Sequence, residues 1–167
     1  MENNKAIIVF YSLEGNSKYA AEKIAGETGA DLLQLIPVKA YPKGGFRKFL
    51  WGGKSAVMAE TPDLEPYEFD GTKYDSVIFV FPVWAGNITP PIRTFIKEND
   101  LSGKRIAAVA CQSGSGAEKA FQKLRECIGT DVETTLVLID PKVKPNVDND
   151  RKIRRFCASF FSGVLKN

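Results

Sequence analysis

Residues 6–17 read AIIVFYSLEGNS, a run of six hydrophobic residues followed directly by a small polar loop. A run that is apolar at consecutive rather than alternating positions is typical of a strand buried on both faces, as in a parallel sheet. Four further runs of this kind follow at 32–36, 77–81, 106–110 and 136–139. The stretch 6–17 therefore predicts the first strand of a parallel sheet and the loop that leaves it.

Helical spacing of apolar residues recurs between these runs, at 20–25, 92–96, 117–128 and 153–165. Pro90-Pro91 suits a helix start, and Gly129 suits a helix end. The basic residues at 151–155 lie opposite the last apolar stripe, and we interpret them as a solvated helix face. Strands alternating with helices through right-handed crossovers predict an α/β fold, a three-layer doubly wound parallel sheet.

The size and composition predict a single domain over residues 1–167, since the chain is 44% hydrophobic and 26% charged. Residues 37–70 form an insertion, because this segment is longer than one crossover helix needs. Its residues Phe46, Phe49, Leu50 and Val57 fall close to one helical face, which predicts a packed crossover helix. The alternative is that aromatic residues of the insertion lean over a functional cleft.

The absence of histidine excludes Ser-His-Asp triads, Cys-His dyads and histidine-ligated zinc. The three cysteines, Cys111, Cys127 and Cys157, are far apart and form no Cys-x-x-Cys pair. Neither a disulfide framework nor a thiolate metal site is expected, and the compartment is expected to be reducing.

The N-terminus lacks the pattern of a signal peptide, and no apolar run approaches the ~20 residues that span a bilayer. We therefore expect a cytoplasmic location and no membrane partner. A net charge of +3, dispersed along the chain, does not indicate binding to nucleic acid.

Ligands of doubly wound sheets bind beside the carboxyl ends of the strands, so the loops there are the candidate site. In the first loop, Gly15 lets the backbone curl, and Ser12, Asn16 and Ser17 add side-chain donors at a helix N-terminus. This pattern predicts a phosphate cradle without a lysine, and the alternative is an ordinary strand-to-helix turn. In the loop after 77–81, Trp84 is poorly placed for the core and suited to stack on a flat ligand.

The loop after 106–110 is small and polar, reading CQSGSG at 111–116, so its backbone can approach a ring system closely. A dinucleotide fingerprint is not complete there, because Lys119 stands in place of the third glycine. Cys111 lies near the expected ring, and we interpret it as a small buried thiol.

Together the three loops resemble those of the flavodoxin family over nearly the whole chain. Residues 12–17 resemble its Ser/Thr-x-Thr-Gly-Asn-Thr phosphate loop, the segment from Pro82 its first flavin loop, and 111–116 its second. The resemblance implies noncovalently bound FMN and a five-stranded sheet ordered 2-1-3-4-5. It also implies the cofactor-binding residues, which are Ser12, Leu13, Glu14, Gly15, Asn16, Ser17, Pro82, Val83, Trp84, Ala85, Gly86, Asn87, Gln112, Ser113, Gly114, Ser115 and Gly116. No metal ligand and no catalytic side chain are implied, because the flavin performs the redox chemistry.

Three features depart from the family pattern. Glu14 stands where a hydroxyl is usual, so one phosphate contact is lost. No second aromatic residue lies between Cys111 and Gly116, so one flavin face is open to a substrate or is covered by Trp51 or Phe46. The sequence pI of about 8.7 also differs from the strongly acidic electron carriers.

These observations predict an FMN protein that carries electrons between redox partner proteins. The alternative is an FMN-dependent oxidoreductase that takes hydride from NAD(P)H and reduces a quinone or another small acceptor. A flavin-free binding module on the same scaffold is a third class. Each of these three functions is compatible with a monomer or a dimer.

Overall fold

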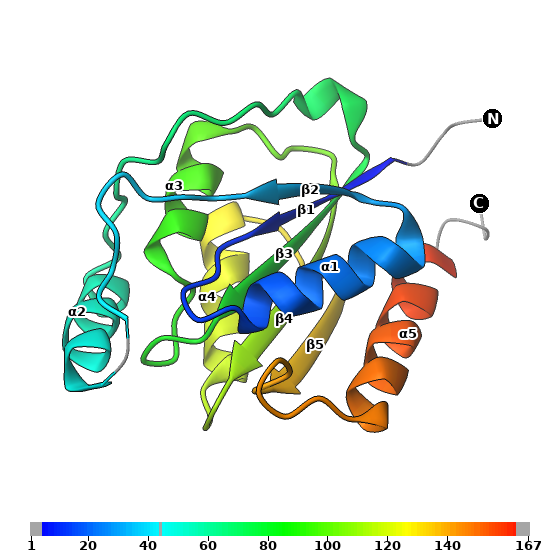
Figure 1. The fold of residues 1–167 in the computed structure, drawn as a ribbon. Coiled ribbons are helices and arrows are strands. Elements are labelled where there is room, and N and C mark those ends of the chain that lie inside the picture. Colours follow the sequence, from blue (N-terminus) through cyan, green and yellow to red (C-terminus); the bar gives the residue numbers. More distant parts are fainter. Residues whose placement is uncertain (1–4, 44, 163–167) are drawn as a thin grey trace.

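The five strands form one parallel sheet with the order β2-β1-β3-β4-β5 (Figure 1). The computed structural model describes residues 5–43 and 45–162, and of residues 45–50 it describes the backbone alone. The strands are β1 (Ala6–Phe10), β2 (Asp31–Gln34), β3 (Ser76–Pro82), β4 (Arg105–Gln112) and β5 (Thr134–Ile139). This confirms the predicted doubly wound α/β fold and its strand order.

The helices follow the strands in the predicted order. They are α1 (Asn16–Thr28), α2 (Gly45–Val57), α3 (Pro90–Glu98), α4 (Ala117–Ile128) and α5 (Val147–Ser162), with a short 3-10 helix at Gly71–Lys73. Helices α1 and α4 both end at a glycine in the left-handed conformation, Gly29 (φ 71°) and Gly129 (φ 78°). Helix α3 begins at Pro90, as the sequence predicts.

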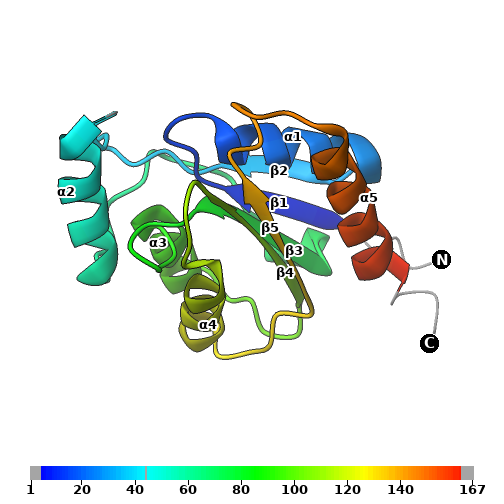
Figure 2. The same ribbon diagram turned by 90° about the horizontal axis from the view of Figure 1, so that it is seen from below.

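The sheet is the middle of three layers. Figure 2 shows α1 and α5 on one face of the sheet and α3 and α4 on the other, while α2 lies beyond the carboxyl ends of the strands. Two hydrophobic cores result, because successive side chains of a strand point to opposite faces. In β3, Val77, Phe79 and Phe81 belong to the core under α3 and α4, whereas Ile78 and Val80 belong to the core under α1 and α5.

These five β3 side chains have no solvent exposure. Burying a large aliphatic or aromatic side chain contributes about 1.5–3 kcal/mol each, so the central strand anchors the sheet. The carboxyl ends of β1, β3 and β4, from which the functional loops leave, are thereby held at fixed positions.

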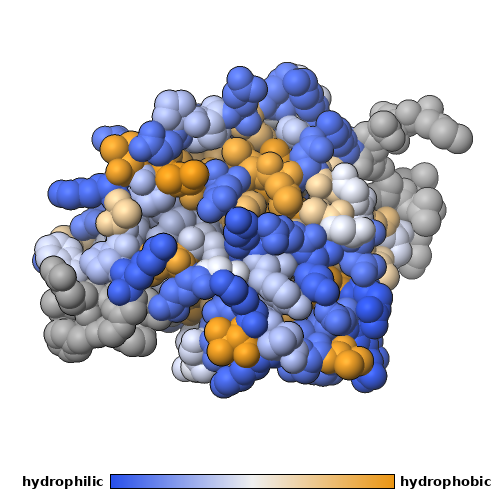
Figure 3. All heavy atoms as spheres, in the orientation of Figure 1, coloured by the Kyte–Doolittle hydropathy of each residue, from blue (hydrophilic) through white to orange (hydrophobic). Residues whose placement is uncertain are grey.

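The interpretation of run 32–36 as buried on both faces is wrong. Leu32 is 45% exposed and Ile36 is 50% exposed, because β2 is an edge strand and only alternate residues face the core. On the face drawn in Figure 3, hydrophobic residues reach the surface in the region of β2, within surroundings that are mostly hydrophilic.

The insertion contains the predicted helix, but this helix does not cover a face of the sheet. Helix α2 stands at the end of the sheet, connected to it by extended segments that pair at Pro37 and Leu64 (Figure 1). Val57, expected on the packed face, is 65% exposed. The expected partners of Val57 lie outside the described side chains; they are Phe46, Phe49 and Leu50.

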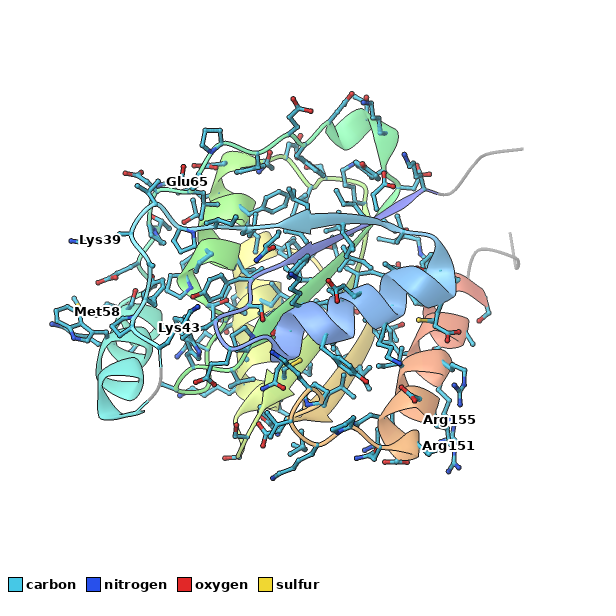
Figure 4. All side chains as sticks on the ribbon, in the orientation of Figure 1. Lys39, Lys43, Met58, Glu65, Arg151 and Arg155 are labelled. Carbon is cyan, nitrogen blue, oxygen red and sulfur yellow. The ribbon has the colours of Figure 1, made fainter. Side chains whose placement is uncertain are left out.

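The basic residues of α5 form a solvated helix face, as predicted. Figure 4 shows Arg151 and Arg155 pointing away from the helix into solvent, and Lys152 pairs with Asp148 of its own helix at 3.0 Å. Val164 and Leu165, expected to extend the apolar stripe, lie outside the described residues. Over residues 5–43 and 45–162, helices with the length and apolar character of a membrane span are absent.

Candidate functional site

A cavity of about 390 Å³ opens at the carboxyl edge of the sheet, where the loops after β1, β3 and β4 meet. Of the seventeen predicted residues, the ones that line it are Leu13, Glu14, Asn16, Ser17, Pro82, Val83, Trp84, Ala85, Gln112, Ser113, Gly114 and Ser115. The lining also includes Gly53 from α2, Cys111 at the end of β4, and Asp140 after β5. The structure therefore gathers most of the predicted residues around one cavity.

Five predicted residues lie outside this lining and shape the loops instead, namely Ser12, Gly15, Gly86, Asn87 and Gly116. The Ser12 Oγ, for example, accepts a hydrogen bond of 3.1 Å from the Gly15 N–H. The Ser12 hydroxyl thus holds the curl of the first loop, which brings Asn16 and Ser17 to the cavity.

The first loop leaves the N-terminus of α1 without a capping group. Gly15 occupies the N-cap with φ 99°, no side chain caps it, and the first turn of α1 carries no acidic residue. The Ser17 side chain is buried to 1% exposure, and its Oγ has no hydrogen-bond partner in the part of the chain that the structure describes. Uncapped N–H groups, the positive end of the helix dipole and an unsatisfied buried hydroxyl together suit an anion.

A lysine that the sequence did not indicate lies against the same loop. The Lys142 backbone N–H donates to the Asn16 Oδ1 at 3.0 Å, which ties the loop after β5 to the start of α1. A Cβ on Gly15 would lie 2.7 Å from the Lys142 Nζ, so the ammonium group lies directly against the backbone of this loop. The predicted cradle without a lysine therefore has a cation beside it.

The second loop is a tight turn built on two residues with positive φ. Ala85 (φ 50°) and Gly86 (φ 70°) form its tip, and the backbones of Trp84 and Asn87 exchange hydrogen bonds of 3.2 and 2.9 Å. This pattern is typical of a type I′ turn, in which alanine is less favourable than glycine. The turn places Ala85 at the mouth of the cavity.

Trp84 lines the cavity, but it is more enclosed than a free stacking platform. Its side chain is 8% exposed and packs edge-to-face against Tyr11 (5.6 Å between centroids) and Tyr41 (5.1 Å). A Cβ on Gly52 of α2 would lie 3.1 Å from the indole, so α2 covers it closely. The expectation that Trp84 is poorly placed for a core is wrong, because the insertion builds a small aromatic core around it.

The insertion covers the cavity differently from the two residues proposed for this role. Trp51 is 55% exposed and lines a separate hollow near Tyr41 and Pro62, so it does not cover the predicted flavin site. The Phe46 side chain lies outside the described residues. Gly53 is the α2 residue that lines the cavity, and no sequence pattern indicated this role.

The third loop is held by its own side chains. The Gln112 Oε1 accepts a hydrogen bond of 3.0 Å from the Ala117 N–H at the start of α4, and the Ser113 hydroxyl donates to Asp140. A Cβ on Gly116, which has φ 108°, would lie 3.0 Å from the Gly86 Cα. The second and third loops therefore touch through two glycines.

Cys111 is a buried thiol at the inner wall of the cavity, as the sequence interpretation expected. Burial raises its pKa to about 12, although the Ser17 hydroxyl, which lies beside the thiol without forming a hydrogen bond of normal geometry, partly opposes this shift. Since the thiolate is the reactive form, this cysteine is inert as a nucleophile.

The cavity thus combines an end that suits an anion with an apolar wall formed by Pro82, Val83 and the Trp84 indole. Such an arrangement suits a molecule that carries a phosphate and a planar ring. Residues Gln112 to Ser115 of the third loop line the same cavity.

Comparison with known proteins agrees with this geometry. A family model described as Flavodoxin matches residues 5–148. No curated protein sequence is significantly similar to the chain.

Several solved structures share the fold. The FMN complex of a flavoprotein from Lactobacillus acidophilus has 21% identity and a TM-score of 0.71, and the match covers 84% of this chain and 96% of that one. A provisionally assigned flavoprotein from Bacteroides eggerthii has 20% identity and a TM-score of 0.74, with 95% and 99% covered. Flavodoxin 2 from Bacillus cereus has 15% identity and a TM-score of 0.60, with 95% and 99% covered.

The family match spans all five strands and the three loops that surround the cavity. The sheet order and the placement of the cavity at its carboxyl edge are those that the sequence resemblance implied. The chain belongs to the flavodoxin family.

Proposed function

We propose that this protein binds FMN in the cavity at the carboxyl edge of the sheet and carries electrons between redox partner proteins. FMN is the cofactor of the flavodoxin family, to which the chain belongs, and the Lactobacillus acidophilus relative was solved in complex with FMN. When bound, the flavin ring supplies the electron-accepting and electron-donating chemistry.

The observation that carries the proposal is the unsatisfied Ser17 hydroxyl at the uncapped start of α1. A buried hydroxyl without a partner costs about 1–3 kcal/mol, and a phosphate would relieve that cost. The Ser17 hydroxyl and the first N–H groups of α1 would hold the phosphate, with the Lys142 ammonium beside them as a counter-charge.

The other loops would orient the ring. The Trp84 indole is fixed by Tyr11 and Tyr41, so it offers a rigid apolar surface rather than a mobile platform. The turn at Ala85 and Gly86 would present backbone groups to one ring edge. Residues Gln112 to Ser115 would meet the other edge with backbone groups, since their side chains are partly committed within the loop.

The proposed partners are redox proteins, with neither nucleic acid nor a membrane among them, and the proposed assembly is a monomer or a dimer. A cytoplasmic location is supported by three cysteines that are all unpaired, as in a reducing compartment.

A second function, an FMN-dependent NAD(P)H oxidoreductase acting on a quinone or another small acceptor, is favoured by the basic net charge. The chain carries +3, whereas a strongly acidic surface steers a carrier to basic partners. A basic hollow beside the cavity, described below, also favours it.

Steady-state assays of the FMN-loaded protein distinguish the two functions. The carrier predicts no NADPH oxidation with a quinone, and electron delivery from the chemically reduced protein to an added redox protein such as cytochrome c. Sustained NADPH turnover with the quinone would instead establish the oxidoreductase. Failure to take up FMN would contradict both and leave a flavin-free binding module.

A further inference from the structure

A second hollow of about 450 Å³ adjoins the cavity. Ala56 at the end of α2 and Ala59 just after it line this hollow, together with residues of α3 and α4. Ala85, at the tip of the second loop, lines both this hollow and the proposed flavin cavity. A molecule in the hollow would therefore lie directly beside the proposed ring site.

The polar side chains of this hollow are mainly cationic. Arg93 from α3 and Lys119 and Lys123 from α4 line it, against one carboxylate, Glu126. The Lys123 Nζ lies 3.5 Å from the Glu126 Oε2, so that carboxylate is already paired. Among the residues that the structure describes, Arg93 and Lys119 form no ion pair with a carboxylate.

The placement of these cations is unfavourable for the empty protein. Lys119 and Lys123 are four residues apart on α4, and like charges at that spacing repel each other on a helix. The Lys119 stem is also held near the turn, since a Cβ on Gly86 would lie 3.0 Å from its Cδ. The Arg93 guanidinium interacts with the Cys127 thiol in the same wall, where it opposes the rise in the pKa of Cys127 caused by burial. Cations gathered in one concave site without matching carboxylates indicate an anionic ligand.

The shape and the lining narrow the class of ligand. A concave site of this volume suits a small molecule rather than a flat protein surface. Its apolar part consists of Ala56, Val57, Ala59, Ala85 and Cys127, so the ligand combines a charged group with an uncharged body. Guanidinium and ammonium groups together are typical of phosphate recognition.

We propose that this hollow, which we call the α3–α4 groove, binds a phosphate-bearing small molecule through Arg93, Lys119 and Lys123. The remainder of the ligand extends past Ala85 toward the flavin cavity. A nicotinamide dinucleotide has this chemistry, and so does free pyrophosphate. The relation of the groove to a flavin rests on the FMN binding that is part of the proposed function, whereas binding of the anion itself does not.

The test is calorimetric titration of the FMN-loaded protein with inorganic pyrophosphate and, separately, with NADP⁺. We compare the wild type with the double variant Arg93→Gln/Lys119→Gln, and with Lys152→Gln as a matched control on α5, on the other face of the sheet. Loss of two charged contacts weakens binding of both ligands at least about tenfold in the double variant, and the control binds like the wild type. Tighter binding of NADP⁺ than of pyrophosphate assigns the groove to the dinucleotide, and equal binding assigns it to the phosphate groups alone.

Absence of binding of both ligands to the wild type, or equal binding to the wild type and the double variant, overturns the proposal. Thermal unfolding of each variant shows that the substitutions leave the fold intact. FMN affinity, measured on the same variants, is expected to be unchanged. A loss of FMN affinity in the double variant would place the FMN phosphate in the groove and would contradict the proposed function instead.

Discussion

Replacing Ser17 with alanine tests whether its hydroxyl binds an anion or only supports the fold. In the protein without FMN, the Ser17 Oγ is buried and has no partner among the described residues, so its removal takes away an unsatisfied polar group. The free energy of unfolding of the apo-protein is therefore expected to stay the same or to rise by up to about 1 kcal/mol.

The same substitution is expected to weaken FMN binding. A hydrogen bond from a hydroxyl to a charged acceptor contributes about 1.5–3 kcal/mol, which corresponds to about 10- to 150-fold in the dissociation constant. Riboflavin has the same ring without the phosphate, so its affinity is expected to stay within about twofold. FMN affinity thus falls without a loss of apo-protein stability, which a merely structural hydroxyl cannot produce.

Urea unfolding of the apo-protein and flavin fluorescence titrations measure the two quantities. Thr89→Val is the matched control, because the Thr89 hydroxyl is also buried and without a partner in the described part of the chain but does not line the cavity. This control should leave FMN affinity unchanged. Equal losses for FMN and riboflavin in Ser17→Ala, or a clear loss of apo-protein stability, would refute the reasoning.

Four further substitutions or reactions test other parts of the site. Lys142→Gln should weaken FMN binding two- to fivefold, because an exposed charge contributes about 0.5–1 kcal/mol. The difference in affinity between the wild type and this variant should shrink as salt is added to the titration. Gly116→Ala should lower the free energy of unfolding by at least about 1 kcal/mol in urea, because φ is 108° and the Gly86 backbone blocks the new methyl group. Trp84→Ala should cost about 3–5 kcal/mol of stability and weaken FMN and riboflavin alike, since the indole is both core and ring contact. Cys111, with a pKa of about 12, should resist iodoacetamide at pH 8 in the folded protein and react after unfolding, as mass spectrometry would show.

Most of the fold could be predicted because a run of consecutive apolar residues marks each buried strand. Buried parallel strands such as β3 carry a run of consecutive apolar residues, Val77 to Phe81 in this case, and glycine marks the ends of α1 and α4 by its conformation. The prediction failed where burial depends on position in the sheet. The run containing Leu32 resembles a central strand in composition, and only the sheet order shows that it lies at an edge.

The part of the site that is formed by the loops after β1, β3 and β4 could be predicted. Ser17, Trp84 and Gln112 belong to the segments at the carboxyl ends of β1, β3 and β4, which lie at the same edge of the sheet, so their convergence follows from the topology. Lys142 and Asp140 were missed although they follow β5 at this same edge, because that loop has no small-residue pattern to mark it. The enclosure of Trp84 by Tyr41 could not be predicted, since it depends on the path of the insertion.

A crystal structure of the protein soaked or grown with FMN would show where the phosphate binds. We expect the FMN phosphate within hydrogen-bond distance of the Ser17 Oγ and the first N–H groups of α1, with the ring against Trp84 and the 112–115 backbone. An FMN phosphate bound anywhere else on the protein, or a Ser17 hydroxyl that still lacks a partner in the complex, would contradict it.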